Sequence, residues 1–162
     1  MNERYYGEIL LEASWIDPAL KISQTEQFDP VRYWTPAIEL MNDIGNMKND
    51  INYSLRYNKQ GQALITEHHR IKGIFWERME LQHFPFDVQE LSLTLTTTRD
   101  NGDVIFVRNE QKPSGVNRRV FTDEQEWHLF EHVDIKITER VDGYFDDGHD
   151  HPVVICSCHA AR

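Results

Sequence analysis

The residues best suited to bind a metal ion stand near the end of the chain, where carboxylates and imidazoles cluster over residues 146–151. Nitrogen and oxygen ligands suit Zn²⁺, and oxygen ligands alone suit Ca²⁺. The four candidate ligands are Asp146, Asp147, His149 and His151. The softer ligands Cys156, Cys158 and His159 follow a few residues later. The spacing matches no zinc motif, so the competing interpretation is a solvated acidic loop between two strands. The sequence implies no required cofactor.

A second group of titratable residues, Glu67-His68-His69-Arg70, contains a histidine pair. Adjacent residues on a strand point to opposite faces. We therefore expect that His68 and His69 do not share a ligand, and we interpret the group as an exposed, charged strand end.

Patterns typical of catalysis are missing from the sequence. It contains no Gly-x-Ser-x-Gly, no phosphate-binding glycine loop and no His-Glu-x-x-His. Carboxylate pairs such as Asp123 and Glu124 are too common to assign without geometry. The sequence therefore predicts a binding protein rather than an enzyme.

The charge balance of the chain limits its partners. Asp and Glu number 27 against 17 Lys and Arg, which gives a net charge of −10 over 162 residues. Nucleic-acid-binding domains normally carry the opposite charge, so we expect no nucleic-acid partner. An acidic surface instead attracts cations, either metals or amines. Apolar runs stay far below the ~20 residues of a membrane helix. We expect one soluble domain over residues 1–162.

The elements that would position these residues are strands. Alternating or β-branched and aromatic sequence predicts strands over 5–15, 52–57, 63–65, 71–81, 88–98, 104–107, 133–137 and 153–158. We expect a turn at 16–18 and a hairpin turn at 59–61. In all, about nine strands separated by turn residues predict an all-β sandwich.

Three segments need separate predictions. Residues 34–41 fit either a Thr-capped helix with proline at its first position or an extended segment, and propensity leaves both open. Residues 109–126 are polar and predict an irregular loop with one helical turn at 122–125. Cys156 and Cys158 lie two residues apart on a predicted strand, where a disulfide would be strained, so we expect free thiols or ligands.

Several short motifs occur in a defined order along the chain. They are Trp15-x-Asp17, Trp34-x-Pro36 followed by Asn42, Gly73-Ile74-Phe75, Phe84-Pro85-Phe86-Asp87 and Trp127-x-Leu129, with Arg162 at the end. In these motifs, the chain resembles the pentameric ligand-gated ion channels, which form the Cys-loop or Pro-loop receptor superfamily. The order and rough spacing agree over nearly the whole chain.

The resemblance implies the extracellular ligand-binding domain of such a channel. This domain is a twisted immunoglobulin-like β-sandwich that assembles as a pentamer and binds a small ligand between adjacent subunits. The resemblance also implies that residues 34–41 are extended. The loop Phe84-Pro85-Phe86-Asp87 and Arg162 would couple ligand binding to pore opening. The implied location is the extracellular or periplasmic face of a membrane, through a channel domain that this chain lacks.

The chain departs from the family in two structural features. The family's bridging cysteines fall near Glu77 and Leu91, so we expect a cysteine-less member whose signature loop is held by packing alone. The family's N-terminal helix and first strand have no counterpart, so we expect the chain to begin near the loop between the first and second strands.

The implied ligand site departs further. An aromatic box holds a cationic amine through cation–π attraction, but Met41, Thr98 and Leu10 stand where the family has aromatic residues. An acetylcholine-like ligand is therefore not expected. The principal-side candidates are Met41, Thr98, Arg99, Tyr144 and Phe145, and the complementary-side candidates are Leu10, Glu12, Leu64 and Thr66.

Two further features of this site stay open. Arg99 would suit a carboxylate-bearing ligand, because guanidinium pairs bidentately with carboxylates. The competing interpretation is a turn arginine that pairs with Asp100 or a neighbouring acid. The acidic segment 146–151 falls where the resemblance places the family's capping loop. Metal binding there would therefore modulate ligand binding. The alternatives to a channel domain are a soluble binding protein of the same fold and an unrelated all-β module that binds metal or sugar.

Overall fold

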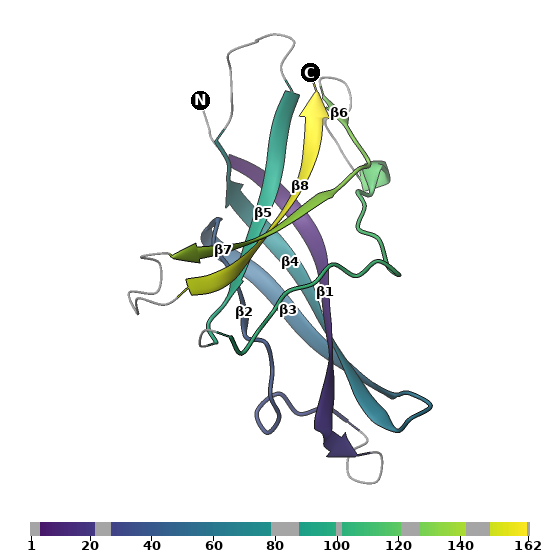
Figure 1. Cartoon of the computed structure of the whole chain (residues 1–162). Helices are drawn as coiled ribbons and strands as arrows, with labels where there is room; N and C mark the ends of the chain where they lie inside the picture. Colours follow the sequence, from purple (N-terminus) through teal and green to yellow (C-terminus); the bar gives the residue numbers. More distant parts are fainter. Residues whose placement is uncertain are drawn as a thin grey trace. The chain divides into compact units, whose positions relative to one another are not determined.

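The computed structural model describes residues 4–21, 27–78, 88–99, 102–120, 127–141 and 150–161. The strands are β1 (Arg4–Lys21), β2 (Ile38–Leu40), β3 (Asp43–Tyr57), β4 (Gln62–Trp76), β5 (Val88–Thr97), β6 (His128–Leu129), β7 (Asp134–Val141) and β8 (Asp150–Ala161), and the 3-10 turn η1 spans Arg118–Val120 (Figure 1). The all-β fold class is confirmed.

The strands form two antiparallel sheets, as an all-β sandwich domain requires. One sheet has the order β1-β4-β3, and the other has the order β2-β5-β8-β6 with β7 also paired to β8. The chain divides into two compact units. The β4 unit comprises residues 6–35 and 44–74, and the β5 unit comprises residues 1–5, 36–43 and 75–162. Each unit is described separately below.

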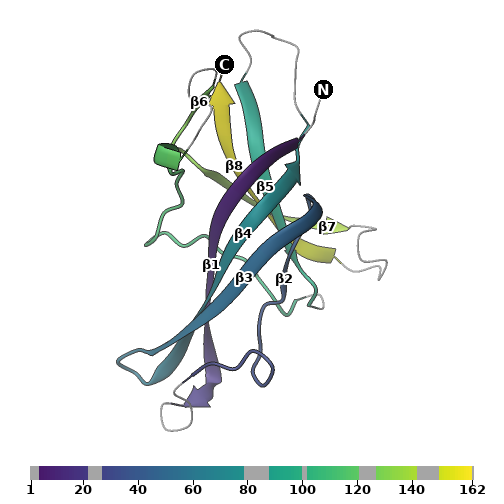
Figure 2. The ribbon, with the colours of Figure 1, turned by 180° about the vertical axis from the view of Figure 1, so that it is seen from behind.

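Strands β3 and β4 form the predicted hairpin of the β4 unit, and β1 lies on the other side of β4 (Figure 2). Asn58 Oδ1 accepts hydrogen bonds from the backbone N–H groups of Gln60 (3.0 Å) and Gln62 (2.9 Å). Gly61 has a φ of 76°, which glycine adopts without steric cost. Local turn chemistry therefore determines this hairpin.

Strand β4 is longer than expected, because it joins the two strands predicted over 63–65 and 71–81. Its odd-numbered residues are buried from Ala63 to Phe75, while the even-numbered ones are exposed or half-buried. Gly73 belongs to the buried face, where an added Cβ would lie 3.1 Å from Met47 Cγ on β3. Glycine thus allows the two strands to pack closely at this position.

Strand β1 runs through the segment 16–18, where we predicted a turn. Pro18 lacks a backbone N–H and would interrupt the hydrogen bonds of a central strand. Strand β1 lies at the edge of its sheet, however, and proline is tolerated at edges, where one side of the strand needs no partner. The turn prediction was therefore wrong.

The core of the β4 unit centres on Leu20, Ala63 and Ile65. Aromatic rings surround it, and Phe28 lies 5.0 Å from Tyr53 and 5.9 Å from Trp15 between ring centroids. Edge-to-face and tilted ring pairs of this kind add to the stabilisation from apolar burial.

In the β5 unit, β5 pairs with β8 from Val88↔Ala161 to Leu95↔Val154. The predicted inward face is confirmed at Leu93 and Leu95, which are buried. Thr96 was expected on the other face but is also buried, and its Oγ1 donates a hydrogen bond to the Pro152 carbonyl at 3.1 Å. The strand is therefore covered on both faces near its end.

Residues 34–37 adopt no helix and lead into β2, which pairs with β5 as Ile38↔Thr97 and Leu40↔Leu95. Ala37 has a φ of 47°, in the left-handed region that no α-helix contains. The helical alternative is therefore wrong, and the extended conformation implied by the resemblance is confirmed over Ile38–Leu40, whereas Ala37 departs from it.

Residues 104–107 form no strand, contrary to prediction. Val104 is buried, but Ile105 and Val107 are each 81% exposed, and none pairs with another strand in the described part of the chain. The apolar alternation is present, but no neighbouring backbone completes the hydrogen bonds of a sheet. The polar stretch that follows is irregular as predicted, apart from η1, while its predicted helical turn at 122–125 lies outside the described residues.

Candidate functional site

The four candidates predicted for the complementary side lie together on one face of the β4 unit. Leu10 and Glu12 on β1, and Leu64 and Thr66 on β4, are all even-numbered, and this even-numbered face is the less buried one of both strands. Leu10 is 76% exposed and Leu64 is 38% exposed. Thr66 Oγ1 lies 2.9 Å from Ser14 Oγ on the neighbouring strand β1.

Charged side chains on this exposed face are paired across the strands. Glu12 Oε1 lies 3.3 Å from His68 Nδ1, and His68 Nε2 lies 3.1 Å from Ser54 Oγ on β3. Closer to the start of β1, Glu8 receives Arg70 at 2.7–2.8 Å and Lys72 at 3.1 Å. A shallow groove of about 170 Å³ lies over this face between Glu12, His68 and Asp50.

The Arg70 and Lys72 side chains lower the pKa of Glu8 by donating hydrogen bonds to its carboxylate. Because the folded-state pKa is depressed, the ion pair contributes above the ordinary pKa of glutamate and is lost as pH falls through the depressed value. We expect the Glu8 pKa, followed by carboxyl ¹³C shifts, to lie below that of an unpaired glutamate. It should rise in the Arg70→Gln variant and at high salt, and an unchanged pKa in Arg70→Gln would contradict the pairing.

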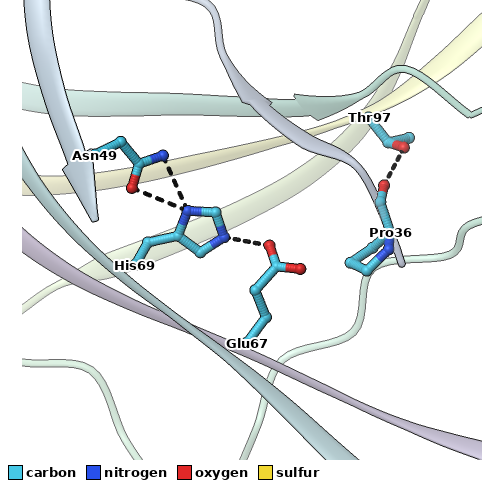
Figure 3. Close-up of polar contacts among 5 residues, drawn as sticks. All are labelled: Pro36, Asn49, Glu67, His69 and Thr97. Carbon is cyan, nitrogen blue, oxygen red and sulfur yellow. Dashed lines mark hydrogen bonds and ion pairs between the residues drawn. The ribbon is translucent and has the colours of Figure 1, made fainter. Parts of the chain in front are cut away.

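The opposite face of the same strand carries a buried polar network (Figure 3). Glu67 and His69 are 2% and 3% exposed. His69 Nε2 is hydrogen bonded to Glu67 Oε1, and its Nδ1 lies 3.1 Å and 3.2 Å from the amide nitrogen and oxygen of Asn49 on β3. Burial first, and then the Glu67 carboxylate, raise the pKa of Tyr53 to about 12.

This network corrects the interpretation of residues 67–70 as an exposed strand end. The prediction that His68 and His69 point to opposite faces is confirmed by their separate partners. The segment lies in the middle of β4, however, so every second residue is buried. An alternating pattern of polar residues gave no signal that one of its two faces is covered.

The principal-side candidates in the described residues lie around the ends of β2 and β5. The Met41 N–H donates to the Thr94 carbonyl at 2.9 Å, directly after β2. Thr98 is exposed, and its N–H donates to the Ala37 carbonyl at 3.1 Å. The Arg99 N–H donates to Thr97 Oγ1 at 3.0 Å. Backbone hydrogen bonds thus fix where these residues stand.

The remaining motif residues have structural contacts. The Trp15 and Trp34 rings meet edge to face with centroids 5.7 Å apart, and Asp17 Oδ1 accepts from the Ala19 N–H at 2.9 Å. In the β5 unit, the Pro36 carbonyl accepts from Thr97 Oγ1 at 2.5 Å (Figure 3). Asn42 bonds to three backbone groups, which are the Trp76 carbonyl, the Ser92 carbonyl and the Thr94 N–H.

Several predicted site residues lie outside the described residues. They are Phe84, Pro85, Phe86, Asp87, Tyr144, Phe145, Asp146, Asp147, His149 and Arg162. The fourth metal candidate, His151, is buried on β8. In the part of the chain that the structure describes, no cluster of three metal-ligating side chains occurs. Cys156 and Cys158 are free, as expected, and burial raises the pKa of both thiols.

The described strands define an all-β domain, and no described helix has the length and hydropathy of a membrane span. Over residues 1–162, the chain matches the family model of the neurotransmitter-gated ion-channel ligand binding domain, so the chain belongs to that family. No curated protein matches the chain significantly. The family consists of extracellular ligand-binding domains of membrane channels, which are not enzymes.

Proposed function

We propose that this chain is the ligand-sensing domain of a pentameric ligand-gated ion channel. A small ligand binds between adjacent subunits, and the loop Phe84-Pro85-Phe86-Asp87 transmits binding to the pore. The family match over residues 1–162 is the observation that carries this proposal. Family membership argues against the unrelated metal- or sugar-binding module that the sequence left open.

The distribution of candidate residues supports the subunit interface. In a ring, each subunit presents two different surfaces to its two neighbours, because the contact is heterologous. Leu10, Glu12, Leu64 and Thr66 share the even-numbered face of the β4 unit, whereas Met41, Thr98 and Arg99 belong to the β5 unit. The two sets thus belong to different strands and different units of the chain, which supports a site that takes one set from each of two neighbouring copies.

The ligand class follows from what these surfaces offer. The described candidates include no aromatic residue, and the complementary face carries a carboxylate at Glu12 beside the imidazole of His68. At the described candidates, ligand recognition would therefore be polar and charge-based, while the two aromatic candidates, Tyr144 and Phe145, lie outside the described residues. Small amino or carboxylate compounds, rather than quaternary amines, are the probes that we expect to shift the NMR resonances of Glu12 and Thr98.

Cysteine cross-linking tests the proposed interface. In a chain carrying both Thr66→Cys and Thr98→Cys, oxidation at high protein concentration should link each subunit to the next and give a ladder that ends at the pentamer. The native Cys156 and Cys158 contribute little background, because a raised thiol pKa leaves little reactive thiolate.

Each single variant serves as the matched control. With one added cysteine on a single surface, cross-linking between equivalent residues can produce only dimers. A double variant that gives the same products as the two single variants would overturn the ring arrangement. Ligand-induced resonance shifts without any ladder would instead favour a monomeric binding protein of the same fold.

A further inference from the structure

Ser92 on β5 is the centre of a polar network within the β5 unit. Its N–H and its hydroxyl both donate to Glu77 Oε2, the former at 2.8 Å. Its carbonyl accepts from Asn42 Nδ2 at 2.9 Å and from the Tyr5 hydroxyl. All three polar groups of Ser92 are thus satisfied by side chains from three distant segments of the chain.

These contacts continue the sheet beyond the end of β2. Strand β2 pairs with β5 only over residues 95–97, and the Met41 N–H makes the next backbone bond, to the Thr94 carbonyl. Beyond Met41, the Asn42 side chain bonds to the β5 backbone in place of a strand. It accepts from the Thr94 N–H at 3.0 Å and donates to the Ser92 carbonyl. Glu77 then accepts from the Ser92 N–H. Without these side chains, the backbone groups of β5 that point away from β8 would be left unpaired beyond the end of β2.

We propose that Glu77, together with Asn42, acts as a side-chain extension of β2 that fastens the end of β4 to β5 in place of a covalent cross-link. The resemblance places the family's bridging cysteines near Glu77 and near Leu91, which precedes Ser92. The expectation that packing alone holds this connection is therefore replaced by a specific hydrogen-bonded clasp, formed by Glu77 and Ser92. The inference does not depend on the proposed channel function, because every contact lies within one unit of this chain.

The chemistry of the clasp suits Glu77. A carboxylate is an acceptor only, and Glu77 receives three donors, which are the N–H and hydroxyl of Ser92 and the Arg78 N–H at 3.1 Å. Charge-assisted hydrogen bonds are stronger than neutral ones. Burial, the nearby Cys158 and the Glu77 carboxylate raise the pKa of Tyr5, so its hydroxyl stays protonated and able to donate to Ser92.

Hydrogen exchange of the full chain, followed by NMR, tests the proposal at single amides. In an antiparallel strand, successive N–H groups point to opposite sides, so the Ser92 amide faces Glu77 while the Leu93 amide faces β8. In Glu77→Met, a substitution without an acceptor, we expect Ser92 protection to fall about 10-fold relative to Leu93, the fold-change of one lost hydrogen bond of ~1.4 kcal/mol. In Glu77→Gln, which keeps one acceptor oxygen, most of the protection should return.

Glu110→Met is the matched control, because Glu110 is an exposed glutamate of the same unit, and it should leave both amides unchanged. Should Glu77→Met fail to fold, Glu77→Asp retains the charge but is too short to reach Ser92, and the same selective loss is expected. Equal losses at Ser92 and Leu93, or no loss at Ser92, would overturn the clasp. A reducing agent should leave wild-type protection at Ser92 unchanged, and a fall on reduction would equally contradict a non-covalent connection.

Discussion

Replacing His69 with alanine is expected to lower the free energy of unfolding by about 3 kcal/mol or more, which is the usual cost of removing one partner from a buried charged pair. Glu67 is 2% exposed and its carboxylate is hydrogen bonded to His69 Nε2. Once the imidazole is removed, that carboxylate stays buried with the Tyr53 hydroxyl but without the imidazole. Urea unfolding of His69→Ala against wild type measures the loss.

His68→Ala is the matched control for this prediction. His68 neighbours His69 in the sequence, but its half-exposed side chain pairs with Glu12 on the opposite face of β4. Exposed ion pairs contribute about 0–1 kcal/mol, so this variant should unfold near the wild-type midpoint. Equal losses from the two alanine variants would show that burial of the Glu67–His69 pair has no energetic consequence.

A double replacement distinguishes the energetic effect of the unpaired carboxylate from that of the packing around the strand. In Glu67→Leu with His69→Leu, no buried carboxylate remains, while the Asn49 amide and the Tyr53 hydroxyl lose their contacts to the pair. Exchanging a buried pair for apolar residues is often neutral. This double variant should therefore be more stable than His69→Ala alone. The reverse order would mean that packing around the strand, rather than the unpaired carboxylate, accounts for the loss.

Replacing Phe75 with alanine is expected to cost about 3–5 kcal/mol of unfolding free energy, the range for removing a buried phenylalanine side chain. Phe75 is fully buried at the end of β4, and its ring stacks on Tyr5 with centroids 5.3 Å apart. The substitution removes apolar burial and leaves a cavity beside Tyr5. The Tyr5 hydroxyl is bonded to the Ser92 carbonyl, so the cavity would also loosen the clasp.

Trp76→Ala is the control for this second prediction, because Trp76 follows directly in the chain but is 49% exposed. We expect a smaller loss for this variant although tryptophan is the larger side chain, since exposed apolar surface contributes less on folding. Equal losses, measured by urea unfolding, would mean that the end of β4 is not packed as the structure describes it.

Local sequence was enough to predict the elements that depend on strand alternation or on turn residues, because neither requires a contact with a distant segment. The alternation of Leu93 and Leu95 with polar residues was enough to predict β5 and its buried face. The hairpin at residues 58–61 follows from the asparagine side chain and a glycine at positive φ. The ordered motifs from Trp15 to Leu129 indicated the family, which the match over the whole chain then showed.

Other features depended on which strand lies beside which. The alternation of residues 104–107 matches that of a strand, yet no neighbour pairs with it in the described chain. Pro18 continues a strand because β1 lies at a sheet edge. Neither outcome is encoded within a few residues, because strand pairing joins segments that are far apart in the sequence.

The polar contacts show the same division. The sequence indicated that Glu67 and His69 belong to an exposed, charged strand end. In the tertiary structure they lie on the covered face of β4, where they form a buried network. Ser92 joins residues that lie 87, 50 and 15 positions away in the sequence. The sequence by itself determined the strand periodicity and the family, while the tertiary structure decided which polar residues are buried and bonded, because hydrogen-bond partners come from separate strands.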